Sequence, residues 1–289
     1  MGRHTAAGRA PLRHQIPPTR AARHKGVKTA RYDAYVAMVL TYRQISIDAA
    51  QPVLADGRFR ATFYDAARYI GGCSKVTEIP EKALIRWLLL LQPARELWFG
   101  ELGFPSWAFY KPEVVEPFYS RGEGDLDLIL CNRHAPHEAA VLECKRVKIV
   151  VEDAEHHALN RLADTREGVG QANRVHSWFG FSQTYLTVIT SVEASAQEDT
   201  NIPCRGIDAA ATPDFGQTKT FRRIVEFPGR DDLNPEIGIV FVEVVQPSGL
   251  SIDQRVTLRV CVHQAAQPRT QSSAATNQIE LVLRERNAA

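Results

Sequence analysis

Two short stretches decide the fold of this chain: Gly124-Asp125-Leu126-Asp127-Leu128-Ile129-Leu130 and Val141-Leu142-Glu143-Cys144-Lys145. Each stretch alternates apolar and polar residues, which is typical of a half-buried strand. The segment between them, residues 132–138, is short and polar, so we expect the two strands to form a hairpin.

The hairpin predicts a cluster of charged side chains on one face. Because strand residues alternate between two faces, Asp127 shares a face with Asp125, and Glu143 shares one with Lys145. If Asp127 lies opposite Glu143, their Cβ atoms are about 5 Å apart. Two carboxylates that close repel unless a proton or a cation lies between them. Mg²⁺ prefers oxygen ligands in octahedral geometry, so this pattern predicts a metal site beside the Lys145 ammonium.

The composition is that of a globular protein with one large domain or two small ones. Its 289 residues are 44% hydrophobic and 24% charged, and no apolar run reaches 18 residues. We therefore expect no membrane segment, and we expect no signal peptide because the N-terminus lacks an apolar stretch. The five cysteines have no C-x-x-C spacing, which favours neither a zinc site nor a disulfide framework. These features together predict a reducing, cytoplasmic compartment.

Charge is distributed unevenly along the chain. Residues 1–31 contain eight Lys and Arg and no acid, which leaves 27 basic and 33 acidic residues in the remainder. This basic arm is expected to be a disordered, solvated tail. A second interpretation is an arm that attracts nucleic acid, and a third is an organellar transit peptide.

The rest of the chain predicts an α/β fold with a mixed β-sheet flanked by helices. We expect a helical N-terminal region over residues 32–95, with helices at 32–70 and from Glu81 to about residue 91. A central core spans 96–192, and a loop followed by a β-rich C-terminal region spans 193–289 and packs on that core. Within the core we expect a helix-permissive segment at 152–163, a break at the glycines of 168–170, and a helix at 171–179 with Val175 and Trp178 on one stripe. Strands are expected at 184–190, 238–245, 255–262 and 278–283.

Asp127, followed sixteen residues later by Glu143-x-Lys145 on consecutive strands, resembles the PD-(D/E)XK nuclease superfamily. The resemblance implies a restriction-endonuclease-like α-β-β-β-α-β core that binds one or two Mg²⁺ ions and hydrolyses phosphodiester bonds. By position, it implies metal ligation by Asp127, Glu143 and the backbone carbonyl of Cys144. Lys145 would orient or activate the attacking water, and Gln171 falls where many relatives place a glutamine on the following helix.

Several assignments stay open at this level. The Pro-Asp pair of the family is absent, so Asp125 is an alternative ligand to Asp127, and the hairpin register decides between them. The family often adds an acid from its first core helix, and the candidates are Glu81, Glu96 and Glu101, each of which has a surface charge as its simpler interpretation. Gln171 is equally well explained as an exposed helix residue. The simplest alternative for the whole cluster is a solvent-facing hairpin with an ordinary salt bridge.

The sequence therefore predicts a nuclease that depends on Mg²⁺ or Mn²⁺ and acts on DNA in preference to RNA. One alternative is a nucleic-acid-binding module of the same fold that does not cut. Another is a structural or interaction protein whose C-terminal strands supply a partner surface. A homodimer or a partner protein is compatible with double-strand cutting, although no residue pattern requires either.

Overall fold

An open sheet of eight strands organises the part of the chain that the computed structural model describes. The described residues are 43–48, 73–105, 107–119, 124–151, 157–193, 223–247, 249–252 and 254–287. All of them belong to one compact unit, residues 40–289. The basic arm and most of the loop expected after residue 193 lie outside the described residues.

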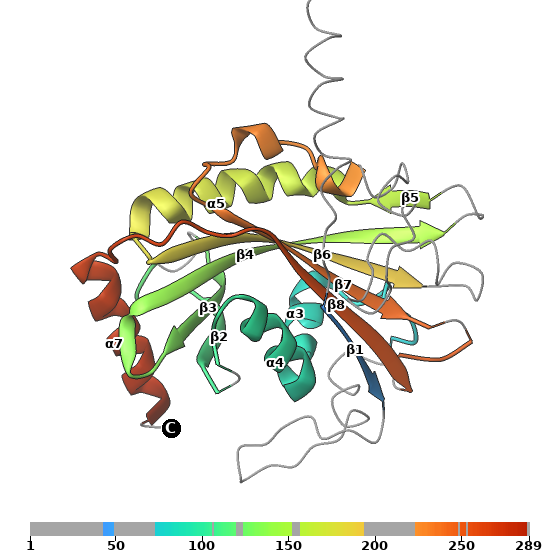
Figure 1. Ribbon diagram of the computed structural model, residues 1–289, viewed down its shortest axis with the longest axis horizontal. Coiled ribbons are helices and arrows are strands. Elements are labelled where there is room, and N and C mark those ends of the chain that lie inside the picture. The colour runs from blue at the N-terminus through green and yellow to red at the C-terminus, as the bar shows by residue number, and fades with distance from the viewer. Residues whose placement is uncertain are drawn as a thin grey trace, which may run out of the picture. The chain divides into compact units, whose positions relative to one another are not determined.

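The sheet is mixed, and its central strands are parallel. Its order is β1 (Arg43–Asp48), β8 (Arg255–Gln264), β7 (Gly238–Gln246), β6 (Gln183–Glu193), β4 (Ala135–Val151), β3 (Leu126–Asn132) and β2 (Phe109–Val114), and β5 (His157–Asn160) pairs with the end of β4. The pairs β4–β6 and β6–β7 are parallel, and the other pairs are antiparallel (Figure 1). The chain is therefore an α/β protein with a mixed open sheet, and its C-terminal strands continue the sheet that the hairpin begins.

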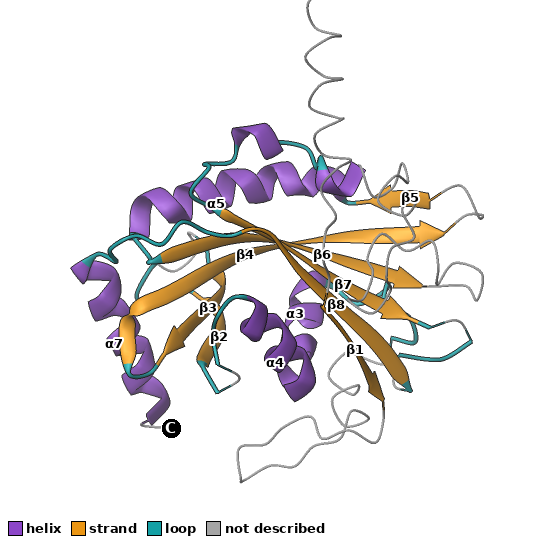
Figure 2. Cartoon of the chain, viewed as in Figure 1, coloured by secondary structure: helices purple, strands orange, loops and turns teal. Residues whose placement is uncertain are grey.

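Helices cover both faces of the sheet. The helices α3 (Glu81–Leu90) and α4 (Gln92–Glu101) pack on one face, and α5 (Thr165–Phe179) packs over β4 and β6 on the other (Figure 2). The last helix, α7 (Ser273–Asn287), lies beside the beginning of β4, and the 3-10 turns η3 (Leu162–Asp164) and η5 (Arg230–Asp232) flank α5. The helices within the described residues are all too short or too polar to cross a bilayer.

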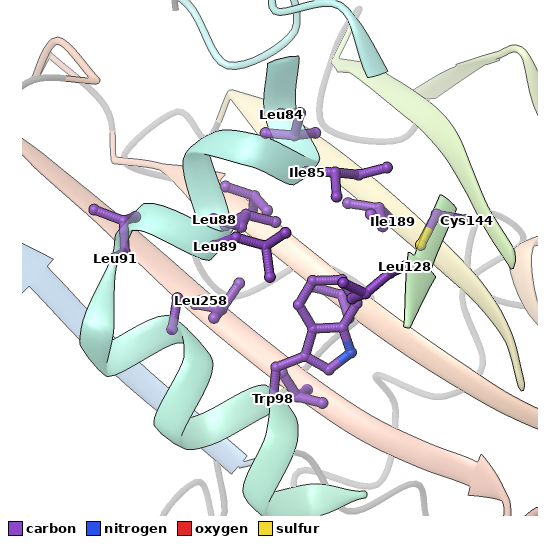
Figure 3. Packing of buried hydrophobic residues seen from close by; sticks show 14 of the residues in the cluster. Leu84, Ile85, Leu88, Leu89, Leu91, Trp98, Leu128, Cys144, Ile189 and Leu258 are labelled. Atoms are coloured by element: carbon purple, nitrogen blue, oxygen red, sulfur yellow. The ribbon is translucent and has the colours of Figure 1, made fainter. Parts of the chain in front are cut away.

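The main core lies between α3, α4 and the sheet. Leu88 and Trp98 from the helices pack against Leu128 and Ile189 from the strands (Figure 3). Burying one such side chain contributes about 1.5–3 kcal/mol relative to leaving it exposed. This face is apolar along the hairpin, so it fixes which residues of β3 and β4 point to the opposite face.

The expected helix from residue 81, the hairpin, and the strands near 184, 238 and 255 are confirmed. The hairpin turn is shorter than the polar segment suggested, because β4 already begins at Ala135. As a result β4 is 17 residues long and pairs with β3, β5 and β6 along its length.

The expectation of a helix over residues 32–70 is wrong where it can be tested. Residues 43–48 form the edge strand β1, in which Ile45 and Ile47 alternate with polar residues and pair with β8. Period-two alternation of β-branched residues favours a strand over a helix. The remainder of that expected helix lies outside the described residues.

The expected strand at 278–283 is also wrong, because these residues belong to α7. Ala275, Ile279 and Val282 recur at helical spacing and are all buried. The hydroxyl of Ser272 accepts a hydrogen bond from the backbone N–H of Ala275 at 3.1 Å, as a helix N-cap does. Ile279, Leu281 and Leu283 are spaced by two residues in the sequence, as in a strand, but the buried residues of this segment follow the helical spacing instead.

Two expectations between the hairpin and β6 need correction. Part of the segment expected to be helix-permissive forms the short strand β5 and then η3. The helix α5 begins at Thr165, six residues earlier than expected, so Gly168 and Gly170 lie inside it. Glycine usually weakens a helix interior, but at residue 168 the Lys145 side chain occupies the space that a Cβ atom would need.

Candidate active site

The hairpin register brings Asp127 and Glu143 face to face. Leu128 pairs with Leu142 across β3 and β4, and continuing this register by one residue places Asp127 opposite Glu143. The Oδ2 atom of Asp127 accepts a hydrogen bond from the backbone N–H of Cys144 at 2.8 Å. Asp125, the alternative ligand, instead forms an ion pair with Lys82 at 2.6 Å.

Asp127, Glu143 and Lys145 together form what we call the β3–β4 cluster. The Nζ atom of Lys145 donates to Oε1 of Glu143 at 2.8 Å, and Glu143 is only 5% exposed. Burial, together with the neighbouring Asp127, raises the pKa of Glu143 to about 8. Burial opposes the charge of Lys145, but the contacts with Glu143 and the field of Asp127 raise its pKa overall. Burial also raises the pKa of Asp127, although the Cys144 N–H and Lys145 oppose this shift.

This cluster interrupts an otherwise apolar row of side chains. The same face of β4 carries Val141 before the cluster and Val147 after it, and both pack in hydrophobic clusters with residues of α5. The face is covered by α5, so the interpretation of the pair as a solvent-facing salt bridge is wrong. Two adjacent charged residues inside such a row oppose folding unless their interactions compensate for lost hydration.

The backbone of β4 is open beside the cluster. The described pairing with β3 ends at Leu142, and pairing with β5 begins at Lys148. Between them, the N–H of Cys144 donates to Asp127 and the N–H of Arg146 donates to Oε2 of Glu81 at 2.8 Å. Since the N–H and C=O of one strand residue point to the same edge, the Cys144 carbonyl also faces this opening.

Of the three helix acids considered, the structure brings Glu81 to the cluster. It is the first residue of α3, directly after Pro80, and its charge contributes to the raised pKa of Asp127. Glu96 accepts a hydrogen bond from Gln92 within α4. Glu101 pairs with Arg43 of β1 at 2.9 Å, at the other end of the sheet, so its assignment as a metal ligand is corrected.

The helix α5 places Gly168 against the cluster, and Gln171 follows within the next turn of the helix. The Oε1 atom of Gln171 is buried and has no hydrogen-bond partner among the described residues. A Cβ atom at Gly168 would lie 2.4 Å from Cγ of Lys145, well inside van der Waals contact. Gly168 therefore leaves the space through which the Lys145 side chain passes. The sequence did not predict this role, because the glycines at 168 and 170 suggested a break in the chain rather than a helix.

The oxygen donors fit a hard divalent cation such as Mg²⁺ or Mn²⁺. Within the described residues, no group of three or more His, Cys, Asp and Glu side chains is placed to hold a metal by itself. The protein would thus supply the Asp127 and Glu143 carboxylates and the Cys144 carbonyl, and Mg²⁺ commonly keeps several waters beside one or two carboxylates. Counting Glu81, three carboxyl groups lie near one ammonium, and a bound cation would favour the charged form of Glu143, whose pKa burial and Asp127 otherwise raise to about 8.

Comparisons of the chain with protein-family models, with curated proteins and with solved structures found no match. The functional argument therefore depends on the fold and on the site itself.

Proposed function

We propose that this chain is a nuclease dependent on Mg²⁺ or Mn²⁺ and that its site is of the PD-(D/E)XK type. One observation carries the proposal: Asp127 lies opposite Glu143, and Lys145 is bonded to Glu143, at an open edge of β4. A structural salt bridge needs one acid for one cation, and this arrangement holds a second carboxylate at the same place.

The order of the elements supports the proposal by analogy. From α3 onward the chain runs through helices, the antiparallel strands β2, β3 and β4, then α5, and then β6 parallel to β4. The α-β-β-β-α-β core of the superfamily has the same order, with its Glu-x-Lys on the third strand. Glu81 begins α3, the first of the two helices that precede these strands, and the superfamily often adds an acid from its first core helix.

The residues of the site have separable roles in the proposed reaction. Asp127, Glu143 and the Cys144 carbonyl would hold the divalent ion, which when bound lowers the pKa of a water molecule and neutralises charge on phosphate oxygens. Glu143 fixes the Lys145 ammonium by a direct hydrogen bond, so that its compact charge can orient a water beside a scissile phosphate. The free carbonyl of Gln171 can accept a hydrogen bond from that water.

We infer DNA as the preferred substrate over RNA, and the direct test is a cleavage assay. Supercoiled, linear and single-stranded DNA and an RNA are incubated with the full chain in Mg²⁺, in Mn²⁺ and in EDTA. Cleavage is expected with either metal and not in EDTA. Asp127→Ala and Lys145→Ala should abolish it, whereas Asp125→Ala, at the residue directly before β3, should retain it. Unchanged cleavage in the first two variants would refute the site.

Two other outcomes identify the rival functions. Binding that persists in EDTA, with no nicking at any concentration of divalent ion, would indicate a nucleic-acid-binding module that does not cut. If Mg²⁺ and Mn²⁺ fail to raise the melting temperature, a structural or interaction role is favoured, because a ligand that binds the native state must stabilise it.

A further inference from the structure

Trp178 is the most exposed tryptophan in the described part of the chain. It is 64% exposed, whereas Trp87 and Trp98 are buried in the main core. Val175 and Trp178 are three residues apart on α5, as expected, but Val175 is buried and Trp178 is not. A single exposed aromatic residue is ordinary on a protein surface, so its neighbours decide whether it has a role.

Trp178 lies on the same flank of α5 as Gln171 and Arg174. Residues three or four apart on a helix are neighbours, so these three side chains form a line, which we call the α5 flank. Arg174 is exposed. The flank therefore offers a cation next to an indole.

The α5 flank begins at the proposed active site. Gly168 lies against Lys145, and Gln171 follows within the next turn of the helix. The Tyr119 ring meets the ring of Phe179, the residue after Trp178, edge-on with the ring centroids 5.1 Å apart. Burial, Glu143 and other neighbours raise the pKa of Tyr119, while Arg174 lowers it. The helix α5 lies over β4 and β6 (Figure 1), so the flank leads away from the cluster along the sheet.

The opposite flank of α5 is occupied by the protein itself. Asn173 donates to the backbone carbonyl of Asp232 at 2.9 Å, and the His176 ring lies 3.1 Å from the Glu236 carboxylate. That side is acidic and closed by the segment after η5. At the start of the helix, the exposed Glu167 would repel a phosphate, so a strand leaving the site would run toward Trp178.

We propose that the α5 flank binds an unpaired strand of the nucleic-acid substrate, with Arg174 on a phosphate and Trp178 stacked on a base. Gln171 and Trp178 are seven residues apart, a rise of about 10 Å, which matches about three stacked nucleotides at about 3.4 Å each. Stacking on an indole requires a base outside the duplex and tolerates any sequence. The inference rests on the proposed nuclease function and specifies its substrate as single-stranded, or frayed beside the scissile bond.

The test measures binding and not cleavage. A short fluorescein-labelled oligothymidylate and a duplex of equal length are titrated with the full chain in EDTA, and fluorescence anisotropy gives the dissociation constants. Trp178→Ala should bind the single strand about tenfold more weakly, with a smaller change for the duplex. Trp178→Phe should retain most of the affinity. Arg174→Ala should reduce the slope of log affinity against log salt by about 0.7.

Trp107→Ala is the matched control. Trp107 is 59% exposed but packs edge-on to His134 at the hairpin turn, and His134 precedes Lys145 by eleven residues in the sequence, so removal of Trp107 should leave binding unchanged. Equal affinities of Trp178→Ala and the control variant would overturn the proposal, as would a wild-type chain that fails to bind the single strand. A change of oligomeric state in Trp178→Ala, without a change in binding, would overturn it in favour of a protein interface.

The two proposals can fail separately. If wild-type protein does not cut in Mg²⁺ but Trp178→Ala still weakens binding, the nuclease function fails and the strand-binding surface stands. If Asp127→Ala abolishes cleavage but Trp178→Ala binds normally, the nuclease function stands and only the α5 flank is refuted.

Discussion

Two buried pairs of a carboxylate and a cation lie on the same face of the sheet, and they differ in what surrounds them. One is Glu143 with Lys145 in the β3–β4 cluster, at 2.8 Å, and the other is Glu243 with Arg259 on β7 and β8, at 3.1 Å. The strand registers place both on the side that α5 covers. Glu243 is completely buried, so depth alone does not separate a structural pair from a functional one.

Charge balance and strand pairing separate them. The Arg259 guanidinium donates to Glu243 and also to the amide oxygen of Gln44, within strands that are paired on both sides. The β3–β4 cluster instead has Asp127 opposite Glu143, with Glu81 nearby, where β4 pairs with β6 on one edge and with neither β3 nor β5 on the other. One carboxylate and one cation between strands that are paired on both edges balance each other's charge. Several carboxyl groups at an unpaired strand edge instead favour binding of a further cation.

The largest expected effect is on cleavage by Glu143→Gln. This nearly isosteric change replaces a proposed carboxylate ligand with a neutral amide, which binds a divalent ion more weakly and attracts the Lys145 ammonium less, so the cleavage rate should fall by about a thousandfold. It also removes a buried carboxyl group whose pKa burial and Asp127 raise to about 8, so the metal-free protein should melt at the wild-type temperature or higher. Gel-based assays measure the cleavage rate, and thermal melts in EDTA measure the melting temperature. Cleavage at the wild-type rate would mean that the Glu143–Lys145 pair is structural, like the Glu243–Arg259 pair.

Glu243→Gln should give the opposite result. It leaves the Arg259 guanidinium buried without its carboxylate, which should destabilise the protein by about 3 kcal/mol or more. Urea denaturation measures this change, and the protein that stays folded should cleave at the wild-type rate. Lost cleavage with unchanged stability would mean that Glu243, too, belongs to the catalytic machinery.

A smaller effect is the dependence of stability on pH, which we expect to arise from His263 on β8, the strand that carries Arg259. Burial and the nearby Arg230, which donates to Nε2 of His263 at 2.6 Å, lower the pKa of His263 to about 4. Because the unfolded histidine titrates near 6.5, the unfolded state binds the proton first, and stability is lost as the pH falls below about 6.5. Between pH 8 and pH 5 this residue should account for a loss of about 2 kcal/mol.

His263→Gln is the comparison variant for this prediction. Glutamine can still accept a hydrogen bond from Arg230 but does not titrate, so its unfolding free energy should depend less on pH over this range. Parallel slopes of unfolding free energy against pH for the two proteins would show that the acid sensitivity arises elsewhere.

Much of this site could be predicted because strand alternation is a local signal. The parity of Asp127, Glu143 and Lys145 follows from the sequence, and the hairpin between them required only a short polar turn. The choice of Glu81 over Glu101 could not be predicted, since it depends on which end of the sheet each helix meets. That is a long-range property, fixed by packing of α3 and α4 against strands far away in sequence.

The failures share a physical cause, which is that local preference was overruled by packing. Ile279 to Leu283 alternate like a strand, yet Ala275, Ile279 and Val282 bury one stripe of a helix. Glycines at 168 and 170 suggest a break in the chain, yet α5 continues through both. In the second case the exception points to the site, because one of the two glycines has no space for a side chain.

Gly168→Ala tests this with the smallest expected effect. A methyl group would lie 2.4 Å from Cγ and 3.1 Å from Cε of Lys145, so the lysine must shift away from Glu143 to admit it. We expect cleavage to fall by about tenfold, while the free energy of unfolding changes by less than about 1 kcal/mol because alanine favours the helix. Gly170→Ala on the same helix is the control, since its nearest contact is Nη1 of Arg174 at 3.7 Å. Equal cleavage by both variants would mean that the position of Lys145 does not require the space that Gly168 leaves. The β3–β4 cluster would then behave like a structural ion pair, whose exact geometry does not affect cleavage.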